Sequence, residues 1–301
     1  MEQTYYPQPH RVTLCTVGTK IVFCVLALTL TYLTAAEPVA HTATLDGHKI
    51  HYLSTGKGEE ALVFIHGWTC DSTFWKGQAP VYEARRSLLI DLPGHGLSDK
   101  PNISYTMDLF ARSVEAVMTH AKVSKATLIG HSMGSPVAVQ FLRLYPDKVA
   151  AIVIVDGSLP MPPKDEAERR KQLAQAAATA KSLRAPGYKT FDTYVINTMF
   201  IKQTDPALRT EILTKMLAAP QYVMASAMDG MNAMTTLTER YPQVPVEAVM
   251  QKRGNATGFD EFLKQHFRLV DYREWDDTGH FLMMERPDRF NKVLVEFLDR
   301  K

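Results

Sequence analysis

The sequence predicts an α/β fold with a mostly parallel, doubly wound sheet and an inserted helical region. Short apolar runs of strand length, separated by helical patterns, recur at residues 61–65, 87–91, 126–129 and 151–155. Such runs suit interior parallel strands, because helices on both sides of the sheet bury both of their faces. Between residues 160 and 240 the strand rhythm stops and only helical stretches follow. With 301 residues, the chain can bury a full core.

The first 36 residues differ from the rest and predict a signal peptide. Residues 21–36 form an uncharged apolar run that follows Arg11 and Lys20 and closes on the small residues Ala35 and Ala36. A basic start, an apolar stretch and a small-residue end are typical of an export signal. The alternative is a retained membrane anchor, which so short a run would span poorly. We therefore expect export, periplasmic or secreted, with membrane contact only if this segment is not cleaved.

The charge and cysteine content of the sequence argue against a nucleic-acid surface and an internal disulfide. The 34 Lys and Arg residues nearly balance the 32 Asp and Glu residues, so no nucleic-acid surface is predicted. Cys15 and Cys24 lie in the removable segment, which leaves only Cys70 and predicts no internal disulfide. Cys70 is expected to pack as a small residue rather than to act as a nucleophile. No metal-ligand cluster or phosphate loop is visible in the sequence, so no metal or cofactor is expected.

The remaining elements follow from local patterns. Asp46-Gly47 predicts a hairpin turn between strands at residues 42–45 and 48–54. Apolar residues at helical spacing predict helices near residues 71–84, 106–122, 136–145 and 287–298. Strand signals resume at residues 246–250 and 267–275. The predicted parts are an N-terminal signal or anchor at 1–36, a core at 37–158 and 241–301, and a helical cap inserted at 159–240.

The strongest functional motif is the sequence Gly-His-Ser-Met-Gly at residues 130–134, set between a predicted strand and a predicted helix. Ser132 would lie at the tip of a strained turn, where a Cβ on either flanking glycine would clash with the neighbouring strand and helix. A serine hydroxyl attacks only when a base takes its proton and a third group orients that base. Among ten histidines, His280 follows the last strand, where open α/β sheets place their sites. His66, His95 and His131 are expected to be structural.

These motifs together resemble the α/β-hydrolase fold, and specifically its capped serine hydrolases. The motifs that carry the resemblance occur in the family's order at residues 66–68 (HGW), 91–98 (DLPGHGLS), 130–134 (GHSMG) and 279–281 (GHF), followed by Glu285 and Pro287. The resemblance implies Ser132 as the nucleophile and His280 as the base. It implies an oxyanion hole made by the backbone N–H groups of Trp68 and Met133, as fixed dipoles for the tetrahedral oxyanion.

The acid is where this sequence departs from the usual family pattern. Most capped members carry an aspartate shortly after the strand that here is 246–250, but residues 251–255 read QKRGN. A family variant moves the acid to the end of the strand after the elbow helix, which here ends in Asp156. Asp156 is therefore preferred, and Asp260 or the lack of any acid are the alternatives.

An elbow serine implies acyl transfer through an acyl-enzyme on Ser132, with a carboxylic ester, thioester or lactone as the substrate. The aromatic residues near the oxyanion loop and the methionine-rich insert predict a small apolar acyl or aryl substrate, bound by Trp68, Met133, Met228 and Met231. Carbon-carbon bond hydrolases and cofactor-free perhydrolases share this triad and stay open as alternatives. So does a non-catalytic ligand-binding protein of the same fold.

Overall fold

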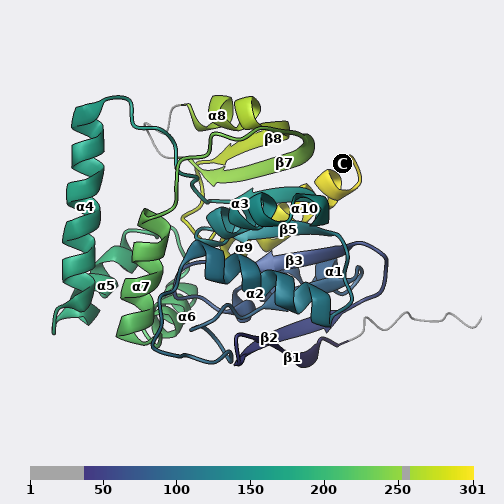
Figure 1. Cartoon of the computed structure of the whole chain (residues 1–301), viewed down its shortest axis with the longest axis horizontal. Helices are drawn as coiled ribbons and strands as arrows, with labels where there is room; N and C mark the ends of the chain where they lie inside the picture. Colours follow the sequence, from purple (N-terminus) through teal and green to yellow (C-terminus); the bar gives the residue numbers. More distant parts are fainter. Residues whose placement is uncertain (1–36, 253–257) are drawn as a thin grey trace, which may run out of the picture. The chain divides into compact units, whose positions relative to one another are not determined.

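The computed structural model describes residues 37–252 and 258–301, and its centre is an eight-stranded sheet in the order β1-β2-β4-β3-β5-β6-β7-β8 (Figure 1). The strands are β1 (Val39–Leu45), β2 (His48–Thr55), β3 (Ala61–Ile65), β4 (Ser87–Ile90), β5 (Ala126–His131), β6 (Val149–Val155), β7 (Tyr241–Gln251) and β8 (Phe267–Trp275). The first two strands are antiparallel to their neighbours, and the other six run parallel. The predicted fold class is confirmed.

Helices connect the parallel strands and cover the sheet. They are η1 (Ser72–Gln78), α1 (Ala79–Tyr82), α2 (Met107–His120), α3 (Gly134–Leu144), η2 (Pro146–Lys148), α4 (Glu166–Arg184), α5 (Tyr188–Asn197), α6 (Pro206–Met216), α7 (Gln221–Asn232), α8 (Phe259–His266), α9 (Leu282–Glu285) and α10 (Pro287–Leu298). Helices α2 and α3 lie on the near face of the sheet in Figure 1, and α9 and α10 lie behind it. The central strands β3, β4 and β5 are buried along their whole length, because both faces are covered.

The N-terminal hairpin forms where the sequence predicts it. Asp46 and Gly47 both have positive φ, at 50° and 82°, which is the backbone of a tight turn between twisted strands. Strand β7 begins at Tyr241, five residues before its predicted start, and helices α8 and α9 were not predicted.

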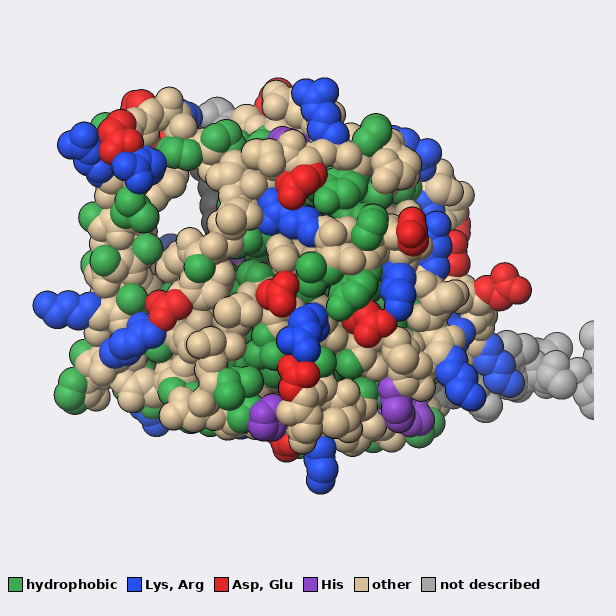
Figure 2. All heavy atoms as spheres, viewed as in Figure 1, with side chains coloured by type: hydrophobic (Ala, Val, Ile, Leu, Met, Phe, Trp, Pro, Cys, Tyr) green, Lys and Arg blue, Asp and Glu red, His purple; other side chains and the backbone are tan. Residues whose placement is uncertain are grey.

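Helices α4 to α7, called the inserted helices below, fill the chain between β6 and β7. They lie to the left of the sheet in Figure 1, on the side where the parallel strands end. Helix α4 packs against α5 and α7, and Leu183 is its one buried residue. Basic and acidic side chains are interspersed over the face of the molecule in Figure 2. The domain boundaries at 158/159 and 240/241, and the role of these helices as a cap, stay predictions.

The predicted signal peptide or anchor, residues 1–36, lies outside the described residues. Within 37–252 and 258–301, no helix combines the length and the apolar character needed to cross a membrane.

The close packing of strand β5 on helix α3 predicts that Gly130→Ala destabilises the protein. A Cβ on Gly130 would lie 2.4 Å from the backbone oxygen of Gly134, so the main chain of the turn would have to move. We expect a loss of about 3 kcal/mol or more in the free energy of unfolding, measured by urea denaturation. The matched control is Gly187→Ala at the start of α5, where a Cβ would meet no atom within 4 Å. Equal unfolding midpoints for the two variants would contradict the prediction.

Candidate active site

The turn between β5 and α3 presents Ser132 at the carboxyl end of the sheet. Ser132 has a φ of +50°, a left-handed conformation that is strained for a residue with a side chain. Its N–H donates to the carbonyl of Val155 on the adjacent strand at 3.0 Å, which holds the turn in place. Both flanking glycines are needed, because a Cβ on Gly134 would lie 2.2 Å from the carbonyl oxygen of Ile65 in β3 and one on Gly130 would meet α3. The predicted reason for these glycines is confirmed.

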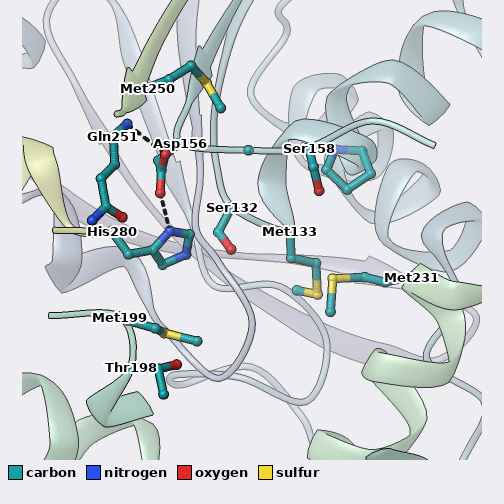
Figure 3. Close-up of a pocket in the computed structure, with 12 residues that line it drawn as sticks. Ser132, Met133, Asp156, Ser158, Thr198, Met199, Met231, Met250, Gln251 and His280 are labelled. Carbon is teal, nitrogen blue, oxygen red and sulfur yellow. Dashed lines mark hydrogen bonds and ion pairs between the residues drawn. The ribbon is translucent and has the colours of Figure 1, made fainter. Parts of the chain in front are cut away.

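Asp156 and His280 are joined by a short hydrogen bond beside Ser132 (Figure 3). His280 Nδ1 lies 2.5 Å from Asp156 Oδ2, although the two residues are 124 positions apart. The other oxygen, Asp156 Oδ1, accepts the backbone N–H of Gln251 at 2.8 Å, and the backbone N–H of Asp156 donates to Val249 at 2.8 Å. Only 3% of Asp156 and 7% of His280 are exposed, so this pair is largely shielded from solvent.

The hydrogen bond to Asp156 determines the tautomer of His280. An ionised carboxylate can only accept, so Nδ1 carries the proton and Nε2 of the neutral ring presents a lone pair. Ser132 lies beside this ring in the same cavity (Figure 3). The arrangement of acid, imidazole and hydroxyl has the chemistry that general-base activation of a serine requires.

The two predicted oxyanion donors come from two turns of the chain, Trp68 from the turn after β3 and Met133 from the turn after β5. Met133 directly precedes the first residue of α3, and N–H groups at a helix start lack acceptors within the helix and favour negative charge. Trp68 lies in the turn after β3, where Cys70 N–H donates to Gly67 O at 3.1 Å. Trp68 is 4% exposed, and the Nε1–H of its indole donates to the carbonyl of Met224 in α7 at 2.9 Å.

The buried histidine His66 holds the turn that contains Trp68. Its Nδ1 is 2.8 Å from the carbonyl of Gly67, and its Nε2 accepts the N–H of Leu92 at 3.0 Å, so Nδ1–H is the donor to Gly67. Burial lowers the pKa of His66, which keeps the ring neutral as this pattern requires. The expected structural role of His66 is consistent with these bonds.

Asp91 and His95 stabilise the neighbouring loop. Burial alone would raise the pKa of Asp91, but N–H groups of Leu97 and Ser72 and the nearby His66 outweigh it and lower that pKa. Burial, followed by the repulsion that a second positive charge would meet at the adjacent His66 ring, lowers the pKa of His95 to about 3. The His95 Nδ1–H donates to the Pro93 carbonyl at 2.9 Å.

A cavity of about 520 Å³ opens above Ser132. Its lining residues come from the sheet edge and from the inserted helices, and they are Ser132, Met133, Pro136, Asp156, Gly157, Ser158, Thr198, Met199, Met231, Met250, Gln251 and His280. Four methionine side chains border this space (Figure 3), and no lysine or arginine does so among the described residues. The methionines make part of this wall flexible and apolar, and Ser158, Thr198 and Gln251 add neutral polar groups.

The structure brings most of the predicted site residues together. Ser132, His280, Asp156, Met133 and Met231 all line the cavity. Asp260 lies on α8, with its carboxylate 3.2 Å from the ammonium of Lys264, and does not line it.

Two of the predicted substrate-binding residues do not line the cavity. The Trp68 indole packs into the protein, where its N–H binds α7, and Met228 lies one turn before Met231 and packs against the core. Cys70 is buried and its thiol is free, and burial raises its pKa well above the ordinary range. No group of three or more His, Cys, Asp or Glu side chains that could hold a metal ion occurs in the part of the chain that the structure describes.

Several lining residues were not predicted from the sequence. Met250 and Gln251 end β7, so the rule that sites lie at the carboxyl ends of strands could have found them. Ser158 lies two residues after Asp156, and the same rule covers it. Thr198 and Met199 follow α5. The methionine-rich insert to which Met199 belongs is expected to border the pocket, but no local pattern distinguishes Met199 from the other methionines or indicates Thr198.

Comparison with known proteins identifies the family of this chain. A model of the alpha/beta hydrolase family matches residues 62–293. A 2-hydroxy-6-oxononadienedioate/2-hydroxy-6-oxononatrienedioate hydrolase of Burkholderia vietnamiensis is 26% identical, over 84% of this chain and 91% of its own length.

Two solved structures share the fold. A thermophilic esterase from Thermogutta terrifontis superposes with a TM-score of 0.74 at 23% identity, covering 88% of this chain and 99% of the esterase. An enol-lactonase from Burkholderia xenovorans gives a TM-score of 0.74 at 22% identity, covering 86% of this chain and all of the lactonase.

The buried neutral state of His95 predicts an acid-sensitive fold. Between the folded pKa of about 3 and the unfolded value of about 6.5, the unfolded state binds the extra proton, so the free energy of unfolding falls as the pH falls through this range. His95→Gln removes this group, so its free energy of unfolding should fall by up to ~3 kcal/mol less than that of the wild type between pH 7 and pH 4. Urea denaturation of both proteins at several pH values between 7 and 4 measures the two slopes. Identical slopes would contradict the prediction.

Proposed function

Because the chain belongs to the alpha/beta hydrolase family, we propose that it is a serine hydrolase that cleaves carboxylic esters, thioesters or lactones with an apolar acyl or aryl group. The observation that carries the proposal is the 2.5 Å contact between His280 and Asp156 beside Ser132, inside one cavity. The proposed catalytic residues are Ser132, His280 and Asp156. The backbone N–H groups of Trp68 and Met133 are the proposed oxyanion donors.

The proposed reaction uses only groups of this chain, the substrate and water. Ser132 Oγ attacks the acyl carbon while its proton moves to His280 Nε2, and Asp156 stabilises the imidazolium. The negative charge on the former carbonyl oxygen is held by the two backbone N–H groups. The proton then passes from His280 to the leaving alcohol, and an ester on Ser132 remains. Water attacks this ester with His280 as the base, which releases the acid and restores the serine.

The composition of the cavity favours a neutral ester. Its described lining offers the thioethers of Met133, Met199, Met231 and Met250, and its polar groups outside the proposed triad are neutral, such as Ser158, Thr198 and Gln251. A carboxylate on the bound substrate would lose water without gaining a cationic partner among these residues, which is costly.

A second candidate is carbon-carbon bond hydrolysis. It is favoured by the dienedioate hydrolase that is 26% identical over 84% of this chain. That relative is named for a dicarboxylate, so the two candidates differ in the charge of the preferred substrate.

The proposed nucleophile predicts that Ser132→Ala abolishes hydrolysis of p-nitrophenyl esters, with a fall in kcat of at least about 1,000-fold. The wild-type protein should react with a fluorophosphonate probe, and the variant should not. The matched control is Ser182→Ala on α4, outside the cavity, which should behave as wild type.

The same assay separates the candidate functions. Wild-type protein that neither hydrolyses esters nor reacts with the probe would contradict a serine hydrolase and favour a ligand-binding role. A higher kcat/KM for a 2-hydroxy-6-oxo-dienedioate than for any neutral ester would favour the second candidate.

The geometry of the acid predicts opposite results for two aspartates. Asp156→Asn removes the charge that orients and stabilises the His280 ring, so kcat should fall by ~10⁴-fold. Asp260→Asn is the matched control and should change kcat by less than about twofold, because Asp260 lies on α8 and pairs with Lys264. Ester hydrolysis by the purified variants measures both effects. The reverse order would move the acid to Asp260.

A further inference from the structure

His131, the residue before the nucleophile, binds the main chain of the base. Its Nε2 lies 3.0 Å from the backbone carbonyl oxygen of His280, and its ring centroid lies 4.8 Å from that of His280. His131 is fully buried. A carbonyl oxygen can only accept, so Nε2 carries the proton and His131 is the donor.

The main chain of His280 is therefore held from both sides. Its carbonyl accepts from His131, and its N–H donates to the carbonyl of Met199 at 2.8 Å. The bond from Nδ1 to Asp156 fixes how the ring is turned, but it does not fix where the main chain that carries the ring lies. A general base must be placed to a fraction of an ångström, and a displacement of 1 Å costs about 100-fold in rate.

We propose that His131 is a positioning residue, whose Nε2–H bond to the His280 carbonyl sets the distance between the base and Ser132. This inference rests on the proposed function, because it concerns the same reaction. His131 and Ser132 are neighbours in the chain, so the hydrogen bond from His131 connects the main chain of His280 to Ser132 through a single peptide bond. One side chain thereby ties the turn that carries the nucleophile to the loop that carries the base.

The surroundings of His131 keep it in the required form. Its ring packs against Phe281 at 5.3 Å and against the edge of Trp75 at 6.4 Å between centroids. Burial, followed by the repulsion between His131 and His280 when both carry a proton charge, lowers the pKa of His131 to about 3. The neutral ring gives its single proton to the His280 carbonyl and adds no positive charge beside the base.

The test compares two substitutions at position 131. His131→Phe keeps an aromatic ring but loses the donor, and it should lower kcat for p-nitrophenyl esters ~10- to 100-fold with KM within about twofold. His131→Gln restores an N–H donor at a similar reach and should recover most of this loss. The rate of labelling by a fluorophosphonate should follow the same order. His95→Phe and His95→Gln are matched controls, because His95 is equally buried but bonds to Pro93 and does not contact His280.

Two results would overturn the inference. One is a folded His131→Phe protein whose kcat stays within about twofold of wild type. The other is an equal loss of kcat in folded His131→Phe and His131→Gln proteins. If His131→Phe does not fold, ¹⁵N NMR of the wild-type imidazoles still decides, since the proposal requires the Nε2–H tautomer and the Nδ1–H tautomer excludes it. This last measurement needs no turnover, so it separates a failure of this inference from a failure of the proposed function.

Discussion

The hydrogen bond between Asp156 and His280 is the interaction on which the candidate site depends. It crosses 124 residues of sequence because β6 and β8 are parallel and end at the same edge of the sheet. Strand β7 lies between them, and its last residue, Gln251, gives its backbone N–H to the second oxygen of Asp156. The backbone N–H at the end of β7 thus holds one oxygen of the Asp156 carboxylate, while the other oxygen contacts His280. The carboxylate therefore comes from β6, although the family pattern described in the sequence analysis would place it after β7.

The same backbone arrangement, a positive φ with a hydrogen bond to the neighbouring strand, occurs at both strand ends that carry proposed catalytic residues. Ser132 after β5 and Asp156 after β6 have positive φ values, +50° and +42°, each at a cost of about 1 kcal/mol or more. Each strained residue donates its backbone N–H to the next strand, at Val155 and Val249 respectively, so the ladder continues past the end of the regular strand. The turns leave the sheet sharply as a result, and both side chains reach the cavity instead of a face of the sheet. Gly157 permits this packing, since a Cβ there would lie 2.0 Å from the hydroxyl of Ser135.

How much could be predicted from the sequence depends on whether a feature is local. The strands, the hairpin turn and the glycines of the elbow follow from residue patterns within a few positions, and the structure agrees. The preference for Asp156 over Asp260 combined a family variant with the position of a strand end, and the observed contact with His280 supports it. Trp68 is predicted to line the pocket because it lies near the oxyanion loop, and Met228 because the insert is rich in methionine. Neither reason carries information on side-chain direction. Thr198, Met199 and the role of His131 depend on how distant segments meet, and no local pattern contains that.

The inserted helices are fastened to the site by specific hydrogen bonds rather than by apolar contact alone. Met199 accepts from the N–H of His280, and Thr204 donates to Glu285, whose other oxygen accepts from Gly279 N–H. The chain at 199–204 thereby helps to hold the loop that carries His280. Helix α4 differs, because most of its residues are exposed, Leu183 alone among them is buried, and its main contacts are with α5 and α7. Segments with few buried contacts open at the lowest free energy, so fluctuations of this region should begin at α4 and leave the loop that carries His280 in place.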